Sequence, residues 1–141
     1  DFDKVKEKNK ENQVFYVQYA FARINSLHRA LNINLNSKII LSEKNFELNK
    51  NEVKIIRKIF EWPKIIESAS KKFEIHKIPY YLYDLSTLFH AYWSKGKEDK
   101  KYKFIENEKV KRIEILAIMN LVTIVIKNGM KILGVSLPEK M

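Results

Sequence analysis

Apolar side chains recur at three- and four-residue steps over residues 13–31, which is the spacing of one face of an α-helix. The stripe consists of Val14, Val17, Phe21, Ile24, His28 and Leu31. Asn12 stands just before it and can act as the N-cap, because its side chain can accept a hydrogen bond from a free helix amide. A helix with one apolar face has to bury that face against other elements.

Four further helices are predicted from the same periodicity and from the positions of proline and glycine. Proline disfavours helix in the residue before it and suits the first turn of a new helix, as at Pro63 and Pro79. Gly96 and Gly134 are plausible helix ends, because glycine adopts the left-handed cap conformation without strain. The predicted helices cover about residues 51–61, 63–73, 80–94 and 108–133.

Composition supports one all-α domain over residues 1–141, an antiparallel bundle of about five helices. Three glycines and three prolines are too few for a turn-rich β-sandwich or barrel. No strand pairs, internal repeats or domain boundaries are predicted. Residues 32–42 and the lysine-rich residues 95–103 are interpreted as loops. The second loop is interpreted as a solvated linker that also makes weak contacts with phosphate.

Charge favours a polyanionic partner, because the net charge of +10 and the pI of about 9.6 create an attractive field for nucleic acid. A lysine-rich genome composition would raise the pI equally. The chain has no cysteine, which excludes disulfides and thiolate metal sites and is compatible with a reducing cytosol. Residues 115–126 are apolar but too short for a membrane span, so a core helix and no membrane partner are predicted.

No catalytic or metal-binding residues are predicted. The three histidines, His28, His76 and His90, do not form the paired spacing of a zinc helix. No glycine-rich phosphate loop is present, and the carboxylates stand among lysines, as surface ion pairs do.

Candidate RNA contacts lie on a second face of the first helix. Tyr16, Tyr19 and Arg23 are spaced i, i+3 and i+7, so they share one side, away from the core stripe. Aromatic rings and guanidinium planes stack on unpaired bases. The alternative is that the tyrosines pack against a neighbouring helix with their hydroxyls at its rim.

A second group of aromatic residues follows Pro79. Its core stripe is predicted to be Leu82, Leu85, Leu88 and Phe89. His90 and Tyr92 are then the candidates for the RNA-facing side of this helix, although a histidine here is more often a satisfied surface or core residue.

Three sequence blocks resemble the arginyl-tRNA synthetase family. Residues 14–24, VFYVQYAFARI, resemble the family segment VYYVQYAHARI. Residues 79–85, PYYLYDL, with FHAY at 89–92, resemble YLYELA and FHRFY. The final residues carry KNG, LGVS and PEKM and resemble KNGLDLLGVSAPERM. The blocks occur in the family's order and cover essentially the whole chain.

The resemblance implies an all-helical DALR-type anticodon-binding domain. In the family this domain follows a class I Rossmann catalytic domain that joins arginine to tRNA with ATP, and the HIGH-like and KMSKS-like signatures of that domain are absent here. The expectation is therefore a fragment of a cytoplasmic, monomeric ligase. The parent enzyme would use ATP and Mg²⁺, and the fragment itself would hold no cofactor. Its expected partners are the anticodon stem-loop of tRNA(Arg) and the missing catalytic domain.

The resemblance also implies which residues contact tRNA, namely Tyr16, Gln18, Tyr19, Arg23, His90, Tyr92 and Met141. Two features depart from the family pattern: Phe21 replaces a common histidine and falls on the core stripe, and the lysine-rich residues 97–103 are not diagnostic. Three alternatives stay open on composition: the related domain of a cysteinyl synthetase, a helical protein-interaction module, and a nonspecific nucleic-acid-binding bundle. The Gln18–Tyr19 pair and the terminal PEKM argue against the first.

Overall fold

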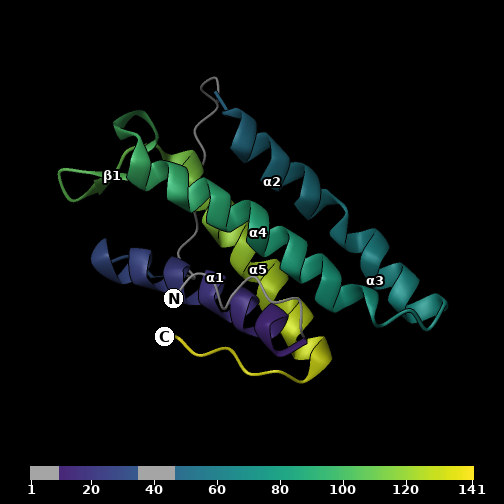
Figure 1. Cartoon of the computed structure of the whole chain (residues 1–141). Helices are drawn as coiled ribbons and strands as arrows, with labels where there is room; N and C mark the ends of the chain where they lie inside the picture. The colour runs from purple at the N-terminus through teal and green to yellow at the C-terminus, as the bar shows by residue number, and fades with distance from the viewer. Residues whose placement is uncertain (1–9, 35–46) are drawn as a thin grey trace.

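The computed structural model describes residues 10–34 and 47–141. Within them the chain forms five α-helices, one short 3₁₀ helix and a two-stranded hairpin (Figure 1). In chain order these are α1 Lys10–Ala30, α2 Lys50–Phe60, α3 Trp62–Lys71, α4 Lys77–Glu98, η2 Lys100–Tyr102, β1 Ile105–Glu106, β2 Lys109–Val110 and α5 Ile113–Leu133. The predicted all-α bundle of about five helices is confirmed.

Helix α4 is the centre of the bundle. It packs against α1, α2, α3 and α5, and Figure 1 shows α2 and α3 following one another along one side of α4 while α1 lies on the other. The core stripe predicted on α1 is buried at Val17, Phe21, Ile24 and His28. Leu82, Leu85 and Phe89 of α4 meet it from the other side as part of one hydrophobic cluster.

Local capping explains where several helices begin and end. Asn49 accepts hydrogen bonds from the backbone amides of Asn51 and Glu52, and the Glu52 carboxylate accepts one from the Asn49 amide, which is a capping box. Pro63 lies in the first turn of α3, and Gly134 ends α5 with a left-handed φ of 68°, both as predicted. Helix α1 begins at Lys10, so Asn12 lies inside the helix instead of capping it.

Two predictions about the end of α4 and the segment after it are wrong. Gly96 does not end the helix, which continues to Glu98. A Cβ at Gly96 would lie only 3.0 Å from the Tyr102 carbonyl oxygen and 3.1 Å from the Phe104 ring. This glycine is therefore needed for close packing of the following segment, and part of the predicted 95–103 loop is helical.

The second wrong prediction is the absence of strand pairs. Ile105 pairs with Val110, and Glu106 with Lys109, in an antiparallel hairpin. Its two turn residues, Asn107 and Glu108, both have positive φ, the conformation that a tight hairpin turn requires. Because glutamate is an unusual choice there, the sequence signal for a turn is weak, and helical periodicity wrongly predicts that residues 108–112 belong to the last helix. The predicted 32–42 loop lies mostly outside the described residues.

Helix α5 is long and apolar enough to cross a membrane by length and composition alone. In the bundle, however, 56% of its most apolar stretch is buried against the other helices. That pattern is typical of the core helix of a folded domain, in agreement with the sequence interpretation.

Candidate nucleic-acid interface

Four of the predicted site residues meet where α1 crosses α4. Tyr16, Tyr19 and Arg23 come from α1 and His90 from α4, and we call these four residues the Arg23 cluster. The Arg23 guanidinium donates to His90 Nδ1 at 2.9 Å and to the Tyr19 hydroxyl at 3.0 Å. The His90 ring lies 4.2 Å from the ring of Tyr16 and 5.4 Å from that of Tyr19, measured between centroids.

The hydrogen bonds of His90 fix its protonation state. Arg23 can only donate, so Nδ1 must accept, while Nε2 lies 3.1 Å from the Tyr16 carbonyl oxygen and must donate to it. The neutral, Nε2-protonated ring satisfies both bonds, and a second proton would point at the guanidinium. Burial, helped by the nearby Arg23 charge, lowers the pKa of His90 from 6.5 to about 4, against the opposing effect of the Tyr16 carbonyl. His90 thus holds Arg23 in place as a neutral acceptor.

Arg23 keeps binding capacity in this arrangement. Its guanidinium lies 4.2 Å from the centroid of the Tyr19 ring and 5.6 Å from that of Trp93, so aromatic rings flank it. Among the described carboxylates none forms an ion pair with it. An arginine has five N–H donors, so a partly exposed guanidinium with a neutral acceptor can still donate to an anion or a base edge.

The C-terminal residues run back along α1, where the chain end lies in Figure 1. Gln18 Nε2 donates to the Ser136 carbonyl oxygen at 2.9 Å, and Arg29 donates to the Glu139 carbonyl oxygen at 3.0 Å. Gln18 therefore positions the tail. Met141 is 51% exposed at the end of this tail. The tail brings a flexible apolar side chain to the α1 side of the bundle.

Tyr92 departs from the sequence expectation of an RNA-facing side chain. It is 1% exposed, its ring packs against Phe104 with centroids 4.7 Å apart, and its hydroxyl donates to Glu52 Oε1 at 2.8 Å. Tyr92 follows His90 by two residues, and each residue turns an α-helix by about 100°. The two side chains therefore lie on roughly opposite sides of α4. Tyr92 has a structural place in the core and presents almost no surface.

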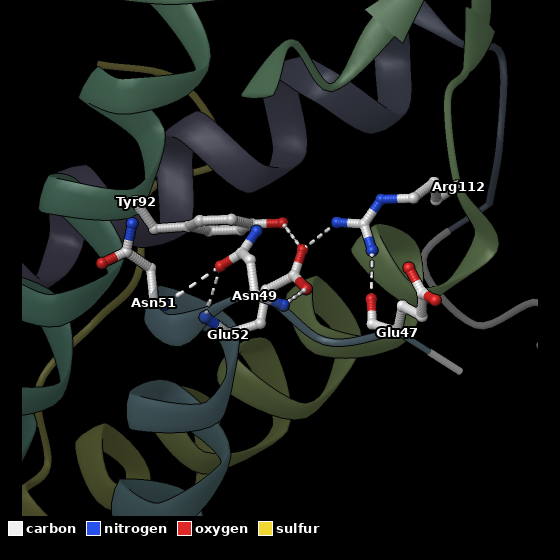
Figure 2. A network of polar contacts seen from close by, with 6 residues as sticks. All are labelled: Glu47, Asn49, Asn51, Glu52, Tyr92 and Arg112. Atoms are coloured by element: carbon white, nitrogen blue, oxygen red, sulfur yellow. Dashed lines mark hydrogen bonds and ion pairs between the residues drawn. The ribbon is translucent and has the colours of Figure 1, made fainter. Parts of the chain in front are cut away.

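Tyr92 belongs to a polar network that ties α2, α4 and the start of α5 together (Figure 2). The Glu52 carboxylate is fully buried and accepts hydrogen bonds from Tyr92, from the Asn49 amide and from the Arg112 guanidinium. Arg112 also donates to the Glu47 carbonyl oxygen at 2.9 Å. The buried carboxylate is thus paired with a cation and hydrogen-bonded, as a buried charge requires.

A hollow of about 410 Å³ lies beside the Arg23 cluster. Its apolar side chains include Leu27, Trp93 and Phe104, and two lysines, Lys97 and Lys103, also line it. Trp93 connects the hollow to the cluster through its contact with Arg23. Neither the hollow nor Trp93 is among the sites predicted from the sequence, although Trp93 is in the aromatic run after Pro79 and both lysines are in the basic 97–103 segment. Apolar rings beside ammonium groups suit a nucleotide, whose base stacks and whose phosphate is anionic.

Metal chemistry has no visible basis in the described part of the chain. No group of three or more histidine, aspartate or glutamate side chains there is arranged to hold a metal ion.

Comparison with known proteins gives a consistent assignment. The profile of the DALR anticodon-binding domain matches residues 17–141. Arginine–tRNA ligase of Pelagibacter ubique is 47% identical over all 141 residues of this chain, and that of Rhizobium meliloti is 37% identical over the whole chain. A solved structure from Campylobacter jejuni, assigned as an arginyl-tRNA synthetase, shares the fold with a TM-score of 0.71 at 21% identity, covering 97% of this chain and 28% of the other.

The chain spans 24% and 25% of the length of the two ligases, about a quarter in each case. The matched part is the quarter at their C-terminal end. Its five-helix fold and the order of its sequence blocks agree with that placement. The chain belongs to the DALR anticodon-binding domain family, in the form found in arginine–tRNA ligases.

Proposed function

We propose that this chain binds the anticodon stem-loop of tRNA(Arg) as the C-terminal domain of an arginine–tRNA ligase. The parent enzyme would attach arginine to tRNA(Arg) in the cytoplasm, with ATP and Mg²⁺ bound by its catalytic domain. The observation that carries the proposal is Arg23, a partly exposed guanidinium between aromatic rings with a neutral acceptor behind it and no described carboxylate partner. A cation in this setting suits unpaired nucleotides, whose bases are aromatic and whose phosphates are anionic.

In this binding mode, different residues have different tasks. The Tyr19 ring and the guanidinium plane offer stacking surfaces, while spare N–H donors of Arg23 reach a base edge or a phosphate. Lys97 and Lys103 supply phosphate contacts at the adjoining hollow. Phosphate contacts position the RNA, and stacking with hydrogen bonds in the unpaired loop gives sequence preference. His90 acts behind this surface by holding Arg23, and Gln18 acts by holding the tail that ends in Met141.

The test is binding of the chain to tRNA(Arg), to the same tRNA with an altered anticodon, and to a non-cognate tRNA. Replacing Arg23 or Tyr19 with alanine should weaken binding to tRNA(Arg) roughly fivefold or more, because one stacked base contributes about 1–3 kcal/mol. Arg57→Ala is the matched control, since Arg57 is an exposed arginine on α2. Circular dichroism of each variant checks that the bundle is intact.

Each outcome separates the competing functions. If Arg23→Ala and Arg57→Ala bind alike, the Arg23 cluster is not the interface. Equal affinity for tRNA and duplex DNA would support a nonspecific basic bundle. No RNA binding even at low salt would support a protein-interaction module.

A further inference from the structure

The outer face of α5 is apolar and unpartnered among the described residues as far as Ile124, after which the exposed Asn128 and Lys131 continue it. Ile113, Leu121, Ile124 and Ile132 are exposed, Leu121 to 42% and Ile124 to 53%. Ala117, Leu121 and Ile124 follow at steps of four and three, so they form one stripe along the helix. The buried residues of α5, among them Met119, Val122 and Ile126, face the opposite way, toward the rest of the bundle.

This stripe is also uncharged. Residues 115–126 contain no charged side chain, although 31% of the chain's residues are charged. A surface helix in so basic a protein would ordinarily carry lysine or glutamate on its solvent face. The absence of charge together with exposed isoleucine and leucine is the composition of the centre of an interface, where charged residues are depleted.

Other exposed apolar residues do not show this pattern. Phe60 and Phe73 are more exposed than any residue of the stripe, but they stand singly on α2 and after α3. Ile66 of α3 has Lys64 and Glu67 as near neighbours in the sequence, and it lines a small hollow with Ile75 and with Ile132 at the end of α5. Isolated apolar residues among charges are common on protein surfaces and do not require a partner.

The size of the stripe indicates what kind of partner can cover it. Twelve helical residues are about 18 Å long and a helix is about 10 Å wide, which gives on the order of 200 Å². A stable complex between separate proteins buries about 800 Å² on each partner. The stripe is too small to hold a second copy of this chain by itself. A covalently attached domain needs less, because attachment supplies a high effective concentration.

We propose that the outer face of α5 docks against the remainder of the ligase polypeptide, the part corresponding to the three quarters of the relatives that this chain does not match. This inference rests on the proposed function and adds the surface at which the two parts meet. Helices α1 and α4, which carry the Arg23 cluster, pack on the opposite, buried side of α5. Docking through the outer face therefore leaves the candidate RNA surface open.

Thiol labelling tests this directly, because the chain has no cysteine of its own. Ile124→Cys is placed in this chain and in the full-length ligase that carries it, and its reaction with a maleimide is followed by peptide mass analysis. Phe60→Cys at the end of α2 is the control, since Phe60 is also an exposed apolar residue on a helix. Circular dichroism and binding to tRNA(Arg) are measured on the same samples.

The expected result is fast labelling of both cysteines in the chain, and labelling of Cys at 124 slowed at least tenfold in the full-length protein, which corresponds to about 1.4 kcal/mol of opening free energy. Phe60→Cys should label equally in both proteins. Equal rates at position 124 in the chain and in the full-length protein would overturn the proposal, as would protection that appears only on raising protein concentration, which indicates a second copy. If tRNA binding fails while protection at position 124 is seen, the proposed function is wrong and the docking surface is not.

Discussion

At the scale of single residues, the Arg23 cluster depends on a histidine that remains neutral. His90 is 5% exposed, yet both ring nitrogens have partners whose donor and acceptor roles are fixed. Arg23 can only donate and the Tyr16 carbonyl can only accept, so a neutral ring is the one state that satisfies both. The resemblance implies that His90 contacts tRNA, whereas in the structure its ring is buried and hydrogen-bonded to Arg23.

The lowered pKa of His90 predicts a dependence of stability on pH. The folded state has a pKa of about 4 and the unfolded state about 6.5, so the unfolded chain binds the extra proton first as the pH falls. The contribution is complete above pH 6.5 and is lost between pH 6.5 and about 4, with an upper limit of about 3 kcal/mol. As the pH falls through that range, the free energy of unfolding of the wild type, measured with urea, should approach that of His90→Gln. A difference between them that stays constant with pH would contradict the neutral histidine.

At the scale of elements, one buried carboxylate connects three helices. Glu52 closes the capping box at the start of α2, accepts a hydrogen bond from Tyr92 in the middle of α4, and is paired with Arg112 just before α5 (Figure 2). Local capping is thus joined to long-range packing through the same side chain. This explains why Tyr92 faces the core although the sequence pattern placed it on the RNA side.

Removing the cation from this network should be costly. Arg112→Met leaves the Glu52 carboxylate buried and without a charged partner, so we expect a loss of about 2–4 kcal/mol in the free energy of unfolding. Arg57→Met, on the exposed face of α2, should change it by less than about 0.5 kcal/mol. The double variant Arg112→Met/Glu52→Gln should recover part of the loss, because the unpaired charge is gone. Denaturant unfolding measures all three, and equal effects of Arg112→Met and Arg57→Met would refute the assignment.

The packing of α4 on α5 shows a second limit of local reasoning. A Cβ at Gly129 would lie 2.7 Å from a methyl carbon of Leu82, which is fully buried. Glycine at this position weakens the isolated helix but lets the two helices approach closely. The sequence shows a glycine inside a helical pattern, and only the neighbouring helix explains it.

At the scale of the whole molecule, the net charge of +10 and the lysine-lined hollow predict salt-sensitive RNA binding. Affinity for tRNA(Arg) should fall linearly with salt concentration on logarithmic axes, with a slope of about 0.7–0.9 per phosphate contact. The double variant Lys97→Gln/Lys103→Gln should reduce that slope by about 1–2, whereas Arg57→Gln should leave it unchanged. Filter binding or fluorescence anisotropy across a salt series would measure the slopes. A slope insensitive to Lys97 and Lys103 would remove the hollow from the interface.

The sequence alone determined the features that depend on neighbours within a turn or two of helix. These include the apolar stripe of α1, the shared face of Tyr16, Tyr19 and Arg23, and the helix end at Gly134, because helical periodicity and caps are local properties. Phe21 was correctly placed in the core for the same reason.

Only the tertiary structure decided the features that depend on contacts between distant positions. His90 meets Arg23 across 67 residues, Tyr92 meets Glu52 across 40, and Gln18 holds the tail across 118. The hairpin at residues 105–110 and the exposed stripe of α5 also follow from how the elements pack. A helix with apolar residues on most of its circumference does not reveal which side the bundle will cover, because that choice is made by the positions of α1, α2 and α4 around it.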